Sequence, residues 1–252
     1  MKKQSQIGQI NMSEDNPYWI SFSDLMSALL VVFILAAVAL MIELTQTQEE
    51  VAKDIEQLQN AEQARKDILT EVRDELRTQD IVVEIADNDS VLRIPQSTLT
   101  FASDSYELST DESARSAVKA IGMALHAALN RPFDPSKNNL MRFDYLDTIF
   151  IEGHTDSLRT QRVKGNWGLS AFRAISLWDF WTQDLQVTPD FDAMTSATGQ
   201  KLFSVSGYAQ TRRIQLDEVT PEQRQQNRRI DLRFTVKRPS IAELKAVTAF
   251  GN

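Results

Sequence analysis

Residues 16–44 read NPYWISFSDLMSALLVVFILAAVALMIEL, and this stretch decides the architecture of the chain. Between Asp24 and Glu43 it has no charged residue, and with Ile20–Ser23 the run reaches about the 20 residues that span a bilayer core roughly 30 Å thick. A cleavable signal peptide has a shorter apolar core and a small-residue cleavage site, and no such site follows Ile42. A buried core helix is disfavoured because nearly every face is apolar. We therefore predict a transmembrane helix over residues 16–44.

Asp24 is an unusual residue at the head of this apolar segment. A carboxylate at the centre of a bilayer costs about 2.5–3.5 kcal/mol on insertion scales, and less near an edge. Ser21, Ser27 and Ala28 lie on the same side of the helix, and small, weakly polar residues favour close helix packing in lipid. Two interpretations remain open. Asp24 either carries a proton or small cation, or it lies in the headgroup layer and caps the start of the helix.

Positive charge is distributed unequally around the segment. Lys2 and Lys3 precede it, whereas Lys53 alone follows it closely. Because cytoplasmic flanks carry the excess of lysine and arginine, we expect residues 1–15 to form a cytoplasmic N-terminal tail. The rest of the protein would then lie on the other side of the membrane.

Composition excludes several classes of function. The net charge of −8 disfavours direct binding to nucleic acid, whose phosphates would be repelled. The chain has no cysteine, and its 2 histidines, His126 and His154, lie far apart in sequence, so we expect no metal site and no cofactor. The sequence has no phosphate-cradling glycine loop, so any motor energy should come from an ion gradient. We expect no enzyme activity.

Residues 45–80 are rich in Glu, Gln, Lys, Arg and Ala and contain neither Gly nor Pro. Apolar residues recur at intervals of three and four, but Glu62 and Arg65 interrupt their register. We predict a helical stalk at 45–80, either an imperfect coiled coil or a single solvated helix.

From Ile81 the pattern changes to that of an α+β domain at 81–237, followed by a C-terminal tail at 238–252. Ser109 or Thr110 is expected to cap a helix that ends near Leu129. Strands are expected around 81–85, 91–95, 147–156, 202–210 and 228–238, and a second helix within 169–185. This order predicts helices packed on one mixed β-sheet.

The helix within 169–185 has apolar residues at helical spacing. We expect its core face to include Phe172, Ile175, Leu177, Trp178 and Trp181.

Four motifs, in this order, carry a family resemblance: IFIEGHTDS at 149–157, NWGLSAFRA at 166–174, VSGYAQTR at 205–212 and NRRIDLRF at 227–234. Together they resemble the OmpA-like peptidoglycan-binding domain, over about residues 81–237. The family implies that Asp156 and Arg173 contact the diaminopimelate of the peptidoglycan stem, with Asn166 and Leu169 shaping the pocket. The RTQRVKG stretch makes the intervening loop longer than the family pattern.

From the residues alone, Asp156 and Arg173 allow two interpretations. Diaminopimelate is a zwitterion. A paired Asp and Arg would bind it, the Asp through the ammonium and the Arg through bidentate hydrogen bonds to the carboxylate. Alternatively, the two side chains form an internal salt bridge. The basic NRR run leads directly into a predicted strand, which favours a structural salt-bridge role for these arginines.

The stretch YWISFSDLMSALLVVFIL at 18–35 is similar to the transmembrane segment of MotB-type stator subunits, whose membrane aspartate conducts protons. Joined to an OmpA-like domain, it resembles the flagellar stator B subunit and the B subunit (ZorB) of the Zorya anti-phage system. The short basic N-terminus and the lack of an obvious plug and linker favour the Zorya type.

The resemblance implies a homodimer surrounded by a ring of multi-span MotA- or ZorA-like membrane subunits. It also implies a proton as the transported ion, with Asp24 as its carrier. The protein would be a single-pass protein of the bacterial inner membrane with a periplasmic C-terminal domain. A passive peptidoglycan anchor without ion transport is the alternative.

Overall fold

The computed structural model describes residues 17–102, 104–136 and 140–237. The tails predicted at 1–15 and 238–252 lie outside these residues. The described residues fall into two compact units, which divide between Asp54 and Ile55.

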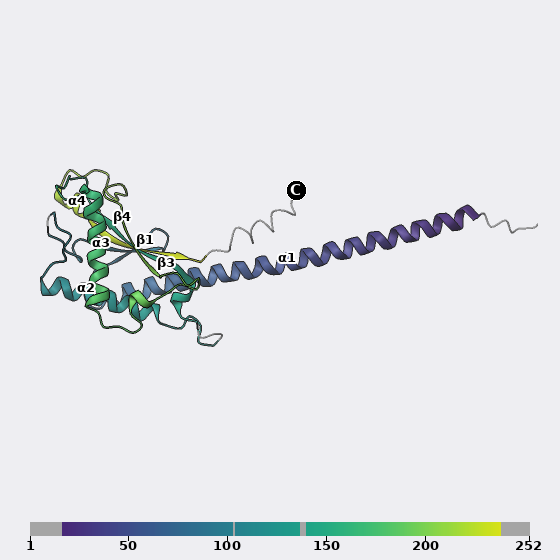
Figure 1. The fold of residues 1–252 in the computed structure, drawn as a ribbon, viewed down its shortest axis with the longest axis horizontal. Coiled ribbons are helices and arrows are strands. Elements are labelled where there is room, and N and C mark those ends of the chain that lie inside the picture. The colour runs from purple at the N-terminus through teal and green to yellow at the C-terminus, as the bar shows by residue number, and fades with distance from the viewer. Residues whose placement is uncertain (1–16, 103, 137–139, 238–252) are drawn as a thin grey trace, which may run out of the picture. The chain divides into compact units, whose positions relative to one another are not determined.

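Helix α1 extends without interruption from Pro17 to Arg77, and its residues up to Asp54 belong to the first unit (Figure 1). Within the described part of the chain, α1 is the one helix long and apolar enough to cross a membrane, judged by length and composition. Its large apolar side chains between Tyr18 and Leu44 are exposed, which differs from the one-sided burial of a core helix.

The C-terminal part of α1 belongs to the second unit. Its buried apolar residues are Ala61, Ala64, Ile68, Leu69, Val72 and Leu76, and most of them join the hydrophobic core. Residues 45–80 were predicted to form a stalk or a coiled coil. From Leu58 onward, the apolar side chains of this segment instead pack against the rest of their own domain. The compact unit begins at Ile55 and not at Ile81, because the α1 side chains complete its core.

A five-stranded sheet forms the centre of the second unit, in the order β1-β2-β5-β3-β4. Strands β3 and β4 are parallel and the other neighbouring pairs are antiparallel. The predicted fold class, an apolar N-terminal helix, a helical region and helices packed on a mixed sheet, is confirmed. The strands are β1 (Glu84–Ala86), β2 (Val91–Pro95), β3 (Leu146–His154), β4 (Phe203–Gly207) and β5 (Arg229–Val236).

Three shorter α-helices complete the unit: α2 (Glu112–Leu129), α3 (Gly165–Gln183) and α4 (Pro221–Asn227). The cap of α2 is Asp111, whose side chain accepts a hydrogen bond from the Ala114 N–H, and not Ser109 or Thr110. Helix α4 was not predicted, although Thr220 and Gln223 form a capping box around a proline, which is a helix-start signal. The 3₁₀ turns are η1 (Arg142–Tyr145) and η2 (Phe191–Ala193).

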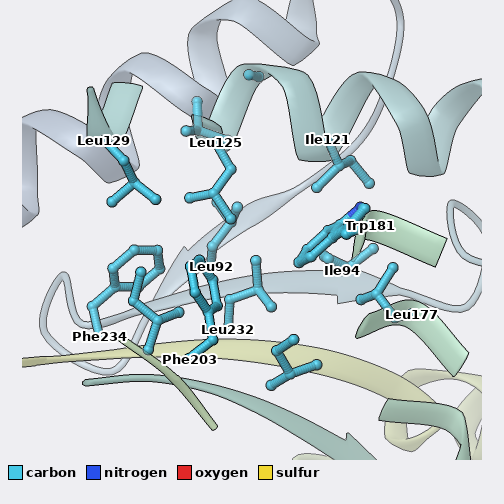
Figure 2. Packing of buried hydrophobic residues seen from close by; sticks show 14 of the residues in the cluster. Leu92, Ile94, Ile121, Leu125, Leu129, Leu177, Trp181, Phe203, Leu232 and Phe234 are labelled. Atoms are coloured by element: carbon cyan, nitrogen blue, oxygen red, sulfur yellow. The ribbon is translucent and has the colours of Figure 1, made fainter. Parts of the chain in front are cut away.

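The core lies between one face of the sheet and the helices (Figure 2). Alternate residues of the strands, such as Leu92 and Ile94 of β2 and Leu232 and Phe234 of β5, point toward α2 and α3. From the helices come Ile121, Leu125, Leu129, Leu177 and Trp181. Fully burying a side chain of this size contributes about 1.5–3 kcal/mol, so this layer supplies most of the stability.

The core face predicted for α3 is partly wrong. Leu177 and Trp181 are fully buried, and the Trp181 indole donates to the Val118 carbonyl at 3.0 Å. Phe172 and Ile175, in contrast, are exposed, at 42% and 37%. Ala174, Leu177 and Trp181 follow the spacing of three and four that defines the buried stripe, and Phe172 and Ile175 fall outside it.

Helix α3 lies unusually close to the ends of β3 and β4. A Cβ atom on Gly153 would lie 1.9 Å from the Ser170 carbonyl oxygen, and one on Gly207 would lie 2.5 Å from the Ala171 nitrogen. Only glycine leaves room for this approach. The close contact places the first turns of α3 beside the loop that follows β3.

Candidate functional site

The predicted site residues converge where β3 ends and α3 begins. Asp156 is the second residue after the end of β3, and the next loop leads into α3, which carries Asn166, Leu169 and Arg173. The Asn166 amide donates to the carbonyl oxygens of Asp156 and Leu158, at 3.3 and 2.9 Å, and so ties the loop to the helix. All four predicted residues are buried.

Asp156 forms its ion pair with Arg228 and not with Arg173. Nη1 of Arg228 lies 2.5 Å from Oδ2 of Asp156, while Oδ1 accepts a hydrogen bond from the Leu158 N–H at 3.1 Å. Arg228 also donates from Nε to the Gln96 side chain at 2.5 Å. The predicted alternative of an internal salt bridge between Asp156 and Arg173 is therefore wrong, because Asp156 pairs instead with an arginine of the NRR motif. The structural role predicted for that motif is confirmed.

The Arg173 side chain contacts the segment that precedes α2, at Phe101, Ala102 and Ser105. Its Nε donates to the Ser105 carbonyl at 2.8 Å, and its guanidinium lies 5.0 Å from the centre of the Phe101 ring. Burial, reinforced by the charge of Arg228, lowers the pKa of Arg173 to about 10, while Asp156 opposes the shift. The guanidinium therefore remains charged at neutral pH, and its side chain is only 4% exposed.

A small cavity of about 10 Å³ lies at this position, roughly the space of one water molecule. Its lining includes three arginines: Arg173, Arg228 and Arg229. Asp156 compensates Arg228 and Asp231 compensates Arg229, whose Nε lies 2.9 Å from Oδ2 of that aspartate. The guanidinium of Arg173 is held by carbonyl oxygens, which carry no full charge, so the cavity has an excess of positive charge.

Arg228, Gln96 and Phe101 are neighbours of this site that were not predicted from the sequence. Arg228 could have been proposed from the NRR motif, because the resemblance includes it. Gln96 and Phe101 lie outside the four motifs, and only the fold brings them to Arg173. A larger cavity of about 780 Å³ between the end of α1 and α2 contains none of the predicted residues among those that line it.

A second polar cluster lies on the sheet face opposite the helices. Glu152, His154 and Asp231 are each about 1% exposed, and their ligand atoms lie within 4.8 Å of one another, close enough to hold a metal ion. Arg233, however, lies 2.9 Å from Glu152, and Arg229 lies 2.9 Å from Asp231. These arginines already compensate both carboxylates, so the cluster favours ion pairs over a divalent cation.

His154 is unusual within this cluster. Its Nε2 lies 3.6 Å from Asp231 and 3.8 Å from Glu152, and among the described residues neither ring nitrogen has a partner at hydrogen-bonding distance. Burial, together with the charge of Arg229, lowers the pKa of His154 below its ordinary value. The folded domain therefore favours the neutral imidazole, which stacks on Tyr208 at 5.5 Å between ring centres.

The predicted ion site lies within α1. This helix begins at Pro17 and has no acidic residue in its first turn, so Asp24 does not cap its start. Ser27 donates from Oγ to the Ser23 carbonyl at 2.7 Å, a hydrogen bond within the helix. Asp24 therefore projects from the body of the helix, next to the side that carries Ser21, Ser27 and Ala28.

Comparison with known proteins identifies the second unit. A family model described as the OmpA family matches residues 100–228, and a search of curated proteins gives no significant match. Among solved structures, a MotB-like protein from Desulfovibrio vulgaris is similar at 18% identity and a TM-score of 0.49, covering 71% of this chain and 98% of the other.

The periplasmic domain of Helicobacter pylori MotB (residues 78–256 of that protein) matches at 18% identity and a TM-score of 0.45, over 67% of this chain and 90% of the other. The cell wall anchor of the type VI secretion system from Pseudomonas aeruginosa matches at 20% identity and a TM-score of 0.44. That match covers 69% of this chain and 99% of the other.

Proposed function

The chain belongs to the OmpA family, and we propose that its domain binds peptidoglycan while α1 anchors it in the bacterial inner membrane. The binding site we propose consists of Asp156, Asn166, Leu169 and Arg173. The observation that carries this proposal is the excess of positive charge at the end of β3, where the buried guanidinium of Arg173 meets no compensating carboxylate at ion-pair distance among the described residues.

The chemistry of the peptidoglycan stem suits such a site. A carboxylate of the stem peptide near the cavity would meet the guanidinium groups of Arg173 and Arg228. A planar guanidinium can donate two charge-assisted hydrogen bonds to one carboxylate, which increases the affinity for the ligand and fixes its orientation. The ammonium of diaminopimelate would approach Asp156. The Asn166 amide fixes the backbone of Asp156 and Leu158. The Asp156 carboxylate would therefore be held in place before the ligand binds.

We further propose that the chain is the B subunit of an ion-driven motor, of the Zorya type. Asp24 on its small, weakly polar helix side supports this role, because a passive anchor has no need of a carboxylate there. Moving one elementary charge through 100 mV is worth about 2.3 kcal/mol, so successive protons passing one carboxylate can drive work. The subunit would act as a homodimer inside a ring of multi-span ZorA-like or MotA-like subunits, with its domain in the periplasm.

Two other functions share the same domain. A flagellar stator B subunit would use Asp24 in the same way, and a passive peptidoglycan anchor would not use it. Neighbouring genes distinguish the two motors, because flagellar and chemotaxis genes would accompany one and a helicase or nuclease set the other.

The substitution Asp24→Asn tests the motor against the anchor. Asn has nearly the same size but cannot exchange a proton, so phage restriction, or swimming in the flagellar case, should be lost at normal protein level. Binding of the same variant to peptidoglycan should be unchanged. Full cellular activity of Asp24→Asn would exclude the ion-carrying role and leave the passive anchor.

A further inference from the structure

We propose that the loop between β3 and α3 is a docking surface for an anionic lipid bilayer. Three exposed apolar side chains and two exposed cations form this surface, which we call the loop patch: Leu158, Arg159, Val163, Lys164 and Trp167. The proposal concerns a ligand other than peptidoglycan and does not rest on the site proposed for the stem peptide.

The apolar side chains of the loop patch are exposed to solvent although an ordered backbone carries them. Leu158 is 59% exposed, Val163 73% and Trp167 55%. The Asn166 amide donates to the Leu158 carbonyl at 2.9 Å, and a Cβ atom on Gly168 would lie 2.1 Å from the Val163 carbonyl oxygen. Because Asn166 and Gly168 flank Trp167 in the first turn of α3, these contacts bring the three apolar residues together there.

The middle of the loop is fixed by the segment that precedes α2. The Arg162 Nε donates to the Asp104 carbonyl at 2.6 Å, and its guanidinium lies 5.7 Å from the centre of the Tyr106 ring. The Arg162 N–H donates to Thr160 Oγ1 at 3.0 Å, and the Thr160 hydroxyl donates to the Asp104 carboxylate. The apolar side chains on either side of Arg162 are therefore held in water instead of packing onto the domain.

The charge of this segment is opposite to that of the whole chain. The chain has a net charge of −8, but residues 157–178 contain no Asp or Glu and include four Arg or Lys residues. Arg159 and Lys164 are exposed, whereas Arg162 lies 3.8 Å from the Asp104 carboxylate. The loop patch therefore presents two cations and no carboxylate of its own.

The loop that precedes α4 adjoins the loop patch. The Ser157 N–H donates to Glu218 Oε2 at 2.8 Å. This second loop adds two large exposed apolar side chains, Leu216 at 71% and Val219 at 80%, and one exposed carboxylate, Asp217. The apolar area therefore extends over both loops, and one carboxylate does not cancel the two cations of the loop patch.

This combination of side chains favours a bilayer over a soluble polyanion. Exposed Leu, Val and Trp beside Arg and Lys are typical of segments that bind membrane surfaces, where apolar side chains enter the boundary below the headgroups and cations meet the lipid phosphates. Tryptophan is enriched at that boundary because its ring is apolar and its N–H is polar. A soluble polyanion would contact the cations but would leave the apolar side chains in water.

The test uses the full-length chain in phosphatidylcholine nanodiscs and separate sucrose-loaded vesicles that sediment. The vesicles contain phosphatidylcholine alone or phosphatidylcholine mixed with phosphatidylglycerol. The unmodified chain should sediment with the mixed vesicles and much less with the neutral ones. Arg159→Gln and Lys164→Gln should each weaken this binding roughly fivefold, the effect of one cation near an anionic surface. Val163→Ser and Trp167→Ser should each weaken it roughly threefold to tenfold, because each removes apolar contact area.

Lys119→Gln and Met123→Ser are the matched controls. Both side chains are exposed on α2, Met123 at 46%. Helix α2 contacts the other end of α3, where Trp181 donates to the Val118 carbonyl, about 21 Å along the helix from Trp167. Both controls should bind the mixed vesicles like the unmodified chain. Equal losses in the controls would show that any surface cation or apolar side chain contributes, and would overturn the assignment to the loop patch.

The outcomes distinguish a bilayer from other ligands. Equal binding of the unmodified chain to neutral and mixed vesicles, or binding to neither, would overturn the proposal. Val163→Ser and Trp167→Ser variants that bind normally while Lys164→Gln does not would indicate an anion site without lipid contact, and would also overturn it.

Arg173→Ala separates the bilayer from the peptidoglycan site. Its side chain is only 4% exposed and lies outside the loop patch, so this variant should bind the mixed vesicles normally even where it fails to sediment with peptidoglycan. A loss of vesicle binding in Arg173→Ala equal to that in Trp167→Ser would contradict the assignment to the loop patch.

Discussion

Asp156 and Arg228 form an ion pair across 72 residues of sequence, with Nη1 of the arginine 2.5 Å from Oδ2 of the aspartate. The pair joins the loop after β3 to the residue before β5. It therefore stabilises the position of Asp156 whether or not a ligand is bound.

Arg228→Ala should destabilise the domain by about 2 kcal/mol, because it leaves the largely buried Asp156 carboxylate without its partner. Chemical denaturation gives this difference in the free energy of unfolding. Arg73→Ala is the control, since the pair of Arg73 with Asp74 is exposed and should contribute less than about 1 kcal/mol. Similar losses in the two variants would contradict the role given to the Asp156–Arg228 pair.

The lowered pKa of His154 makes the free energy of unfolding depend on pH. The folded pKa of His154 lies below its ordinary value of 6.5, so the unfolded chain binds the proton more readily. The contribution of neutral His154 is therefore present above about pH 6.5 and is lost as the pH falls from there toward the folded pKa.

Melting temperatures of the full-length chain at pH 7.5 and pH 5.5 test this expectation. His154→Gln should show a smaller decrease between the two values than the unmodified chain, because the neutral amide does not titrate. His126→Gln, at a histidine whose Nε2 lies 2.9 Å from the Pro189 carbonyl, should keep the decrease caused by His154. An unaltered decrease in His154→Gln would refute the assignment.

The packing of α1 predicts where the domain can be cut. A fragment of residues 55–237 should unfold cooperatively. A fragment of residues 81–237 lacks Ile68, Leu69, Val72 and Leu76. Burial of each of these side chains contributes a few kcal/mol to the free energy of unfolding. Their combined loss therefore approaches the whole stability of a typical domain. Calorimetry distinguishes the fragments, and a cooperative transition of equal midpoint in the shorter one would contradict the packing of α1.

Gly153→Ala should destabilise the domain by about 3 kcal/mol, because its Cβ would lie 1.9 Å from the Ser170 carbonyl and would force α3 away from the sheet. The same displacement should weaken peptidoglycan binding, since α3 carries Arg173. Thermal melting and binding can be compared in one preparation. A fully stable Gly153→Ala would mean that α3 can shift at little cost.

Much of this fold could be predicted from sequence. The apolar character of residues 16–44, the two strands predicted on either side of residues 86–90 (ADNDS) and the four family motifs each depend on local pattern, and the structure contains the corresponding elements. At Asp87, Asn88 and Asp89 the backbone has positive φ, a conformation that aspartate and asparagine tolerate better than most residues.

What could not be predicted depends on contacts between distant segments. The apolar spacing of residues 58–76 suits a coiled coil and a core helix equally, and only the sheet decides between them. Phe172 and Ile175 are apolar residues of the kind that a core face contains. They are exposed nevertheless, because the close approach of α3 to Gly153 and Gly207 sets the rotation of the helix about its axis. Arg228 is the partner of Asp156 because β5 lies beside β3, a pairing that no local pattern contains.

The proposed assembly predicts a partner. One helix bearing Asp24 cannot by itself enclose an ion path, so the chain should purify from native membranes as a dimer together with a multi-span membrane protein. Mass measurement of the complex in mild detergent tests this expectation. A lone monomer with no membrane protein bound would count against the motor and favour the passive anchor.

Sedimentation with insoluble peptidoglycan tests the binding site most directly. The full-length chain in detergent should sediment with it, and Arg173→Ala should remain in solution, because a ligand carboxylate would lose its arginine partner at a cost of about 2–5 kcal/mol. Arg115→Ala, which removes a half-exposed arginine from a pair with Asp184, is the control and should sediment normally. A folded Arg173→Ala variant that sediments as well as the unmodified chain would contradict the account.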